Sequence, residues 1–574
     1  MSKKKASMHA ILSTMSTLFT FSVLAGLAAA SDPPIAIQET ALLPAAQAIL
    51  DSVQDGNGEA FRSFAKHDLP TLEVDLKPLV ATLPSGPDVL RLGPTAVCYV
   101  LHRLFMRTSA WLVKGLNPQG MSWNKTSPLK AVLFAKMPQG IRQLVEEKLA
   151  GPGLTLRETA IVAALFRHFV HQEASELLRK VYSLRGLPLG GGMGTNKTEV
   201  AVEMFTSSFI MGRRPAVMTR SAMMSDLQSM PETYPAWPFV RASLRKVMKE
   251  QFEETHAMSA AQKGPDFFAA ARVAHEVTDR MGFWQQPACG GLKDTLVKME
   301  DRDTGRVRLA SFYGKSLHDG TWQFSESESY LRQLGALDES NPSNPRVIIP
   351  NYMYGASNCI PTTEHISVCC ANECEAITQR LEAAVACSEA PPETIAAIVT
   401  SLPSSTVPEN RTLSALMLYR LNSIAASHSG VVPLHGRLFA QWLHHAYPRE
   451  CPYPHVAGTT HPQDTDDWLK NTGLDYTASA ADMARRAGSD PQLWKRPSAA
   501  SRPLESAPWS YDEELFVPGK GTGLPEGWMV LHGAVYAASA AIVAFGIMLL
   551  RTSKGARRSA AMALETQASK LYQV

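Results

Sequence analysis

Apolar residues recur at helical spacing through most of the chain. In residues 42–53 and 95–116 they fall at i, i+3 and i+4, the spacing of an amphipathic helix. Thr155-Leu-Arg-Glu158 has the form of a capping box, and the apolar run that it opens reaches Val181. The same spacing predicts further helices at residues 199–211, 238–252, 267–283, 373–386, 392–402, 412–427 and 437–447. The sequence therefore predicts a mainly α fold with little β structure.

Turn-forming residues divide these helices into lobes. Residues 186–194 are rich in glycine but lack the Gly-x-x-x-x-Gly-Lys-Ser/Thr order of a phosphate-binding loop, so we interpret them as a connection. Residues 347–349 are β-branched and stand before Pro350, which predicts a short strand. A chain of this length exceeds what one core usually organises, so several lobes are expected. We predict helical lobes over residues 31–186 and 195–350, a Cys/His-rich helical region over 351–487 and a Pro/Ser/Gly-rich stalk over 488–527.

The N-terminal residues have the organisation of a signal peptide. Lys3, Lys4 and Lys5 precede an apolar run over residues 11–27, and Ala28-Ala-Ala30 supplies the small residues needed for cleavage. We therefore predict a signal peptide over residues 1–30. An uncleaved N-terminal anchor is the alternative, because signal sequences and short anchors overlap in length.

Residues 528–550 are predicted to cross a membrane. They contain no Asp, Glu, Lys or Arg, and about 20 such residues span the hydrocarbon core as a helix. Basic residues begin at Arg551, whereas Glu526 lies on the other side, and positive residues favour the cytoplasmic face. The pattern predicts a single-pass type I protein of the secretory pathway, in the plasma membrane or another endomembrane, with a cytoplasmic tail over 551–574. A buried core helix is the alternative interpretation.

Composition excludes some classes of protein and supports export. The chain has 574 residues, a formal net charge of +3 and 45% hydrophobic residues, which argues against a disordered chain and against a nucleic-acid partner. Sequons for N-glycosylation begin at Asn124, Asn196 and Asn410. They fit an ectodomain that is lumenal or extracellular.

Cysteines gather in one region of the chain. Cys98 and Cys289 stand alone, whereas six others are clustered: Cys359, Cys369, Cys370, Cys374, Cys387 and Cys451. In an oxidising compartment this cluster predicts disulfide bonds, although six cysteines allow many pairings. Because a ring between neighbouring cysteines is strained, Cys369 and Cys370 are each expected to pair elsewhere.

Residues 292–312 resemble one half of an EF-hand in shape. A short helix leads into the charged turn 300–305, and Val307 begins an extended exit. The positions that would supply calcium ligands hold Glu300, Arg302, Thr304, Arg306 and Ser311. Arg302 places a cation where a ligand is needed, and Ser311 cannot replace the bidentate glutamate at the end of the loop. We therefore expect the shape without calcium binding, and keep a calcium-responsive scaffold as a second alternative function.

Histidines are dense between residues 435 and 461. His435, His444, His445 and His455 are candidate metal ligands, since imidazole is a common ligand of zinc and copper. A lumenal metal-dependent oxidoreductase or hydrolase is thus one alternative function. The other interpretation is structural: His444 and His445 fall near a helix C-terminus, where the helix dipole favours an imidazolium.

Other catalytic patterns are incomplete. Gly355-Ala-Ser357-Asn-Cys359 lacks the closing glycine of a nucleophile elbow. Cys359 could form a thiol dyad with a histidine, but a disulfide role fits its neighbours better. Glu364, Glu373 and Glu375 offer carboxylates whose convergence the sequence does not indicate.

Several strings between residues 154 and 461 resemble a known but uncharacterised family. They include Arg306-Val-Arg-Leu-Ala-Ser-Phe-Tyr313, Ser367-Val-Cys-Cys-Ala-Asn-Glu-Cys374 and Arg449-Glu-Cys-Pro-Tyr-Pro-His455. In these strings the chain resembles secreted or membrane-anchored proteins of dinoflagellates and related algae. The resemblance implies export and a degenerate EF-hand-like segment, and it carries no catalytic residue. We therefore favour a binding or structural ectodomain, for which a protein or a glycan is a possible ligand, over an enzyme.

Overall fold

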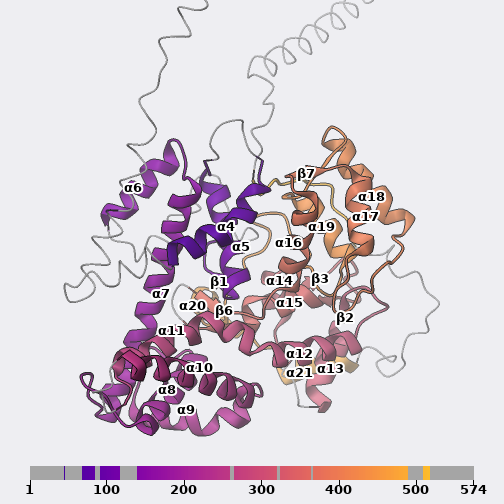
Figure 1. Ribbon diagram of the computed structural model, residues 1–574. Coiled ribbons are helices and arrows are strands. Elements are labelled where there is room, and N and C mark those ends of the chain that lie inside the picture. Colours follow the sequence, from indigo (N-terminus) through magenta and orange to yellow (C-terminus); the bar gives the residue numbers. More distant parts are fainter. Residues whose placement is uncertain are drawn as a thin grey trace, which may run out of the picture. The chain divides into compact units, whose positions relative to one another are not determined.

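Helices form most of the described part of the chain, which confirms the predicted mainly α fold (Figure 1). The structure is a computed structural model and describes residues 68–84, 91–116, 139–258, 264–319, 324–362, 366–488 and 508–517, together with Pro44. Apart from Pro84, these residues belong to one compact unit. No helix within these ranges is both long and apolar enough to cross a membrane.

Several predicted features lie outside the described residues. They are the signal peptide at 1–30, the helix at 42–53 apart from Pro44, the sequon at Asn124, the span at 528–550 and the tail at 551–574. Asn196 and Asn410 lie within the described part of the chain, and both are exposed.

The N-terminal helices pack around a first hydrophobic core. They are α4 (Leu69–Ala81), α5 (Pro94–Thr108), α6 (Gln139–Ala150), α7 (Leu156–Arg185), α8 (Thr195–Ile210), α9 (Arg220–Thr233), α10 (Trp237–Met258) and α11 (Phe267–Trp284). The predicted capping box begins α7: the Thr155 hydroxyl accepts from the Glu158 N–H, and the Glu158 carboxylate accepts from the Thr155 N–H. Most of this core comes from residues between Leu69 and Trp284, on both sides of the predicted boundary at 186–195, and residues from β5, β6 and the 508–517 segment complete it.

The helix predicted at 95–116 ends earlier, at Thr108. Ala110 has a φ of +54°, and the next residues form strand β1 (Trp111–Val113) instead of further helix. β1 pairs with β6 (Ile366–Val368), which also pairs with β5 (Ile360–Pro361). The Trp111 indole donates to the carbonyl of Thr278 in α11 at 2.9 Å. Contacts with distant parts of the chain therefore override the local apolar pattern here.

The second core contains the EF-hand-like segment. Its elements are α12 (Gln286–Lys298), β2 (Arg306–Arg308), α13 (Leu309–Asp319), α14 (Glu328–Gln333), β3 (Leu337–Asp338), β4 (Arg346–Ile348), α15 (Ile349–Met353) and the 3₁₀ turn η3 (Ala356–Asn358). The predicted order of helix, charged turn and extended exit is confirmed. β2 pairs antiparallel with β4, and Val307 lies opposite Val347. The strand predicted at 347–349 is thus β4, one residue earlier than expected.

The third core is formed by the Cys/His-rich region. Its elements are α16 (Glu373–Val385), β7 (Glu389–Ala390), α17 (Pro392–Ser401), α18 (Ala415–Ser427), β8 (Val432–Pro433) and α19 (Arg437–Ala446); α20 (Thr465–Thr472) and α21 (Ala480–Gly488) follow it along the chain. The four helices predicted between residues 373 and 447 agree with α16, α17, α18 and α19 to within a few residues. α21 packs against α13 of the second core.

Residues 508–517, which fall in the predicted stalk, pack against α19. The Arg437 guanidinium donates to the Asp512 carbonyl at 2.7 Å, and the Phe516 N–H donates to the His435 carbonyl at 2.9 Å. Val517 is buried in the first core. This part of the stalk therefore belongs to the fold, because the buried Arg437 needs its carbonyl and hydroxyl acceptors.

Disulfide bonds form among the clustered cysteines, as expected. In the described part of the chain they join Cys359 to Cys369, Cys374 to Cys451 and Cys289 to Cys370. Cys369 and Cys370 pair with separate partners, which confirms that expectation. Two assignments were wrong: Cys387 is free and exposed just beyond the end of α16, and Cys289 is bonded. Cys289 reaches Cys370 because α12 begins beside this segment, where Gln286 donates to the Ala371 carbonyl.

We predict that Cys289→Ala/Cys370→Ala lowers the free energy of unfolding by roughly 2–4 kcal/mol. This bond closes a loop of 81 residues, and its removal frees the unfolded chain. Urea denaturation without reductant measures the change. Cys387→Ala, the exposed free cysteine, is the matched control and should change stability by less than about 0.5 kcal/mol. Equal effects of the two variants would contradict the pairing.

Candidate functional site

The predicted histidine cluster does not form a metal site. Each imidazole bonds a backbone group: His435 Nε2 lies 2.8 Å from the Thr82 carbonyl, His444 Nδ1 2.7 Å from that of Cys451 and His455 Nε2 2.7 Å from that of Gly335. The fourth imidazole, His445, bonds the backbone of Pro508. In the described ranges, no group of three or more His, Cys, Asp or Glu is arranged to hold a metal. The zinc or copper interpretation is therefore corrected, because the four imidazoles do not converge and one nitrogen of each bonds the backbone; within the described residues, Nε2 of His444 and Nε2 of His445 are buried without a hydrogen-bond partner.

Burial keeps these histidines neutral. Burial and then Arg103 lower the pKa of His435 to about 3, and burial lowers the pKa of His445 to about 3 as well. Burial likewise holds the pKa of His444 well below its usual value. Since carbonyls only accept, His435 donates from Nε2, and its Nδ1 accepts from the Tyr99 hydroxyl at 3.1 Å. The imidazolium predicted for His444 and His445 at the end of α19 is thus not favoured.

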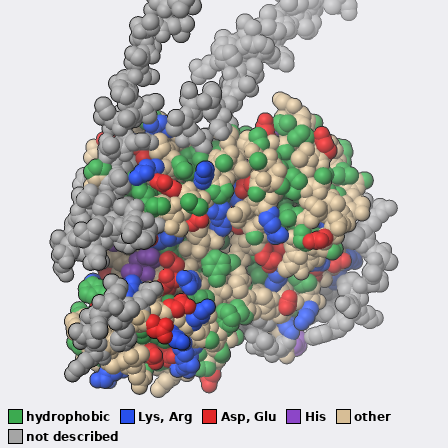
Figure 2. Space-filling model, in the orientation of Figure 1, with side chains coloured by type: hydrophobic (Ala, Val, Ile, Leu, Met, Phe, Trp, Pro, Cys, Tyr) green, Lys and Arg blue, Asp and Glu red, His purple; other side chains and the backbone are tan. Residues whose placement is uncertain are grey.

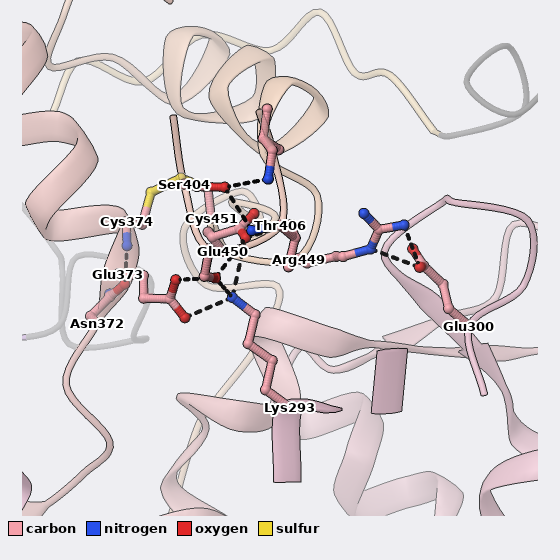
Figure 3. Close-up of polar contacts among 12 residues, drawn as sticks. Lys293, Glu300, Asn372, Glu373, Cys374, Ser404, Thr406, Arg449, Glu450 and Cys451 are labelled. Carbon is pink, nitrogen blue, oxygen red and sulfur yellow. Dashed lines mark hydrogen bonds and ion pairs between the residues drawn. A yellow bond between two sulfur atoms is a disulfide. The ribbon is translucent and has the colours of Figure 1, made fainter. Parts of the chain in front are cut away.

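A four-residue segment, Pro448–Cys451, joins the second and third cores (Figure 3). Glu450 has a fully buried carboxylate, which accepts from the Thr406 hydroxyl at 2.6 Å and pairs with Lys293 Nζ at 3.1 Å. Cys451 forms the disulfide with Cys374 at the start of α16. Two neighbouring residues of this segment therefore bind a loop and two helices that lie far apart in the sequence.

Lys293 sits between two carboxylates. Its ammonium group is 2.6 Å from Glu373 and 2.7 Å from the hydroxyl of Ser405, in addition to its contact with Glu450 (Figure 3). A serine beside a lysine is one arrangement of a nucleophile and its base. Here the ammonium donates to all three partners, and Ser405 donates to Glu373 at 2.6 Å. All these contacts of Lys293 are donated hydrogen bonds and ion pairs, so this group holds α12, the start of α16 and the 405–406 loop together, and Lys293 does not act as a base for the serine.

Arg103 on α5 forms a second group of the same kind. Its Nε lies 3.0 Å from Glu375, and its Nη1 and Nη2 both bond Glu382, the latter at 3.1 Å. Burial alone would lower the pKa of Arg103, but Glu375, Tyr99 and Glu382 outweigh it and hold that pKa well above its usual range. Here one guanidinium bonds two carboxylates, so the bonded group of three carries a surplus negative charge. Arg107, one turn further along α5, interacts electrostatically with both of these carboxylates as well.

A cavity of about 190 Å³ lies beside Arg103, between α5, α16 and α19. Its charged or titratable lining includes His102, Arg103 and Glu375, and the remaining lining combines apolar residues such as Leu112, Leu443 and Phe516 with uncharged polar ones. The Nδ1 atom of His102 is buried and has no hydrogen-bond partner in the described structure. Apolar cavities of roughly 150 Å³ hold a benzene ring, so this one has room for a ring-sized group.

Sequence reasoning singled out two residues of this site but not their partners. Glu373 and Glu375 were candidate paired carboxylates, but the structure places them in separate groups. Glu373 binds Lys293, and Glu375 binds Arg103. Glu364 lies outside the described residues. Arg103 and Lys293 carried no local signal, because a lone charged residue in an amphipathic helix usually faces solvent, and the same holds for Glu450 in the turn after α19.

Comparison of the chain with models of protein families, with curated proteins and with solved structures finds no match in any of the three. The assignment of this site therefore depends on its own geometry and charge.

We predict that Lys293→Met lowers the free energy of unfolding by roughly 3–5 kcal/mol, because it leaves the buried Glu450 carboxylate without a cation. Urea denaturation measures this change. Lys298→Met removes the same charge from an exposed position of the same helix, and it should cost less than about 0.5 kcal/mol. Similar effects of the two variants would show that the Lys293 ion pairs carry no net stability.

We also predict that stability falls as the pH drops from about 6.5 towards 4. The unfolded chain protonates its histidines near pH 6.5, whereas His435 and His445 protonate in the folded state only near pH 3. Each contributes a loss of about 1.4 kcal/mol per pH unit in that window. Burial raises the pKa of Glu326 to about 7 and also raises the pKa of Glu276 and of Glu300, which acts in the opposite direction, but more imidazoles than carboxyls are shifted by burial. Urea denaturation at pH 7.5 and 5.0 tests this, and His435→Gln should reduce the difference.

Proposed function

We propose that this protein is exported and anchored in a membrane, and that its helical ectodomain binds a ligand in the cavity beside Arg103. The signal-peptide pattern and the apolar run at 528–550 support export and anchoring. Disulfide bonds indicate an oxidising compartment and agree with that location. The resemblance to exported algal proteins stays part of this proposal.

The charge of the cavity carries the binding proposal. Glu375 lines the cavity with 16% of its side chain exposed, whereas Arg103 and Glu382 are almost fully buried. Two carboxylates against one guanidinium leave a negative charge that a bound cation would neutralise. A ligand with a positive group and an apolar, ring-sized body therefore fits the cavity best.

A partner protein can supply the same chemistry through a lysine or arginine side chain, so a protein ligand stays within the proposal. A glycan has no positive group and complements the cavity less well. On the face shown in Figure 2, basic side chains alternate with acidic ones and form no extended basic area. This supports a partner other than a nucleic acid, whose phosphates require such an area.

We predict that benzylammonium binds the protein roughly tenfold more tightly than benzyl alcohol, the equivalent of about 1.4 kcal/mol for one charge-assisted contact. Benzoate, which has the same ring with a negative group, should not bind. Isothermal titration calorimetry on the non-reduced protein measures all three. Glu375→Gln should remove most of the preference for the amine.

A variant that fills the cavity distinguishes binding in the cavity from binding elsewhere on the protein. Ala440 lines the cavity on α19, so Ala440→Phe should abolish benzylammonium binding. Ala426 is exposed on α18, and Ala426→Phe is the matched control that should bind as the unmodified chain does. Equal binding of the amine and the carboxylate, or binding that survives Ala440→Phe, would contradict the proposal.

A further inference from the structure

The turn between α12 and β2 is wound like a cation-binding loop. Arg302, Asp303 and Gly305 have φ values of +61°, +54° and +70°. The Glu300 carboxylate accepts from the N–H of Gly305, and the Asp301 N–H donates to the Arg306 carbonyl at 2.7 Å. These bonds bend the chain around its own acidic side chains, as a loop that encloses a cation does.

The guanidinium of Arg449 is bound by these acidic side chains. Its Nε and Nη2 both lie 2.7 Å from Glu300 Oε2, and Nη2 lies 2.6 Å from Asp303 Oδ1 (Figure 3 shows the contact with Glu300). The side chain of Arg449 is 15% exposed and that of Glu300 only 4%. Arg302, which the sequence places at a ligand position, is 49% exposed and lies 3.9 Å from Asp301. The positive charge inside the turn therefore comes from a residue about 150 positions along the chain.

We propose that residues 300–305 form a cation-binding turn whose cation is the guanidinium of Arg449. The chemical class of the ligand is a planar organic cation, since the guanidinium presents several N–H donors to two carboxylates at once. The turn is thereby closed without a metal ion. This inference goes beyond the proposed ligand binding, because it concerns the turn between α12 and β2 and the segment after α19, and not the cavity beside Arg103.

The fit of the neighbouring backbone supports this role. A Cβ atom on Gly305 would lie 2.1 Å from the carbonyl oxygen of Pro448, so only glycine allows this approach. Gly305 also supplies the carbonyl that the Ile349 N–H bonds, which ties the turn to β4 and α15. Arg449 thus enters a turn that is held on its other side by the paired strands.

The test compares three variants of the full chain, purified without reductant. Arg449→Gln removes the charge and leaves a shorter, uncharged polar side chain, and it should lower the melting temperature by roughly 5–10 °C. Arg449→Lys keeps a cation and should lose less than half as much. In Arg449→Ala, free methylguanidinium should recover part of the loss in a saturable way. Calcium chloride at millimolar concentration should leave the unmodified chain unchanged, because the turn is already occupied.

Glu300→Gln/Arg449→Ala is the matched control, since it lacks both the cation and its main acceptor, and methylguanidinium should not stabilise it. Equal losses in Arg449→Lys and Arg449→Gln would overturn the proposal, and so would a folded Arg449→Ala that methylguanidinium does not stabilise. A calcium-dependent rise in the melting temperature of the unmodified chain would overturn occupancy by Arg449. If Arg449→Ala does not fold, the comparison of Lys with Gln decides the matter.

Discussion

The buried carboxylate of Glu450 is the constraint on which the arrangement of the second and third cores depends. A charge without contact to water must be paired and hydrogen-bonded, or its burial costs several kcal/mol. Glu450 meets this need only where Lys293 of α12 and the 405–406 loop come together. The residue before it, Arg449, enters the 300–305 turn, and the residue after it, Cys451, is bonded to Cys374. Because Arg449, Glu450 and Cys451 are consecutive, the formation of any one of these contacts brings the other two within reach.

The start of α16 separates two groups of the same design. Glu373 contributes to the group around Lys293, whereas Glu375, two residues later and on another face of the helix, contributes to the group around Arg103. In both groups one cation lies between two carboxylates. In the group around Lys293, Ser405 and Thr406 donate further hydrogen bonds to the carboxylates. In the group around Arg103, Glu375 lines the cavity between α5, α16 and α19.

The sequence predicted what depends on local spacing and missed what depends on distant partners. Helix α7, with its capping box, follows from residues three and four apart, as do α16 to α19. The neighbouring pair Cys369 and Cys370 could be assigned to separate bonds from geometry alone. The partner Cys289 could not, because it is 81 positions from Cys370. Likewise the acidic turn at 300–305 was recognised, but not Arg449, since no local pattern connects them.

The histidines show why residue type alone was a poor guide to the site. Imidazoles that bond backbone carbonyls in a dry interior stay neutral, and their number adds no positive charge to the region. This matters for the cavity, since a protonated His102 would cancel the surplus charge of the Arg103 group. Burial lowers the pKa of His102 to about 4, although Glu375 opposes that shift. Above that pH His102 adds no positive charge to the cavity beside Arg103.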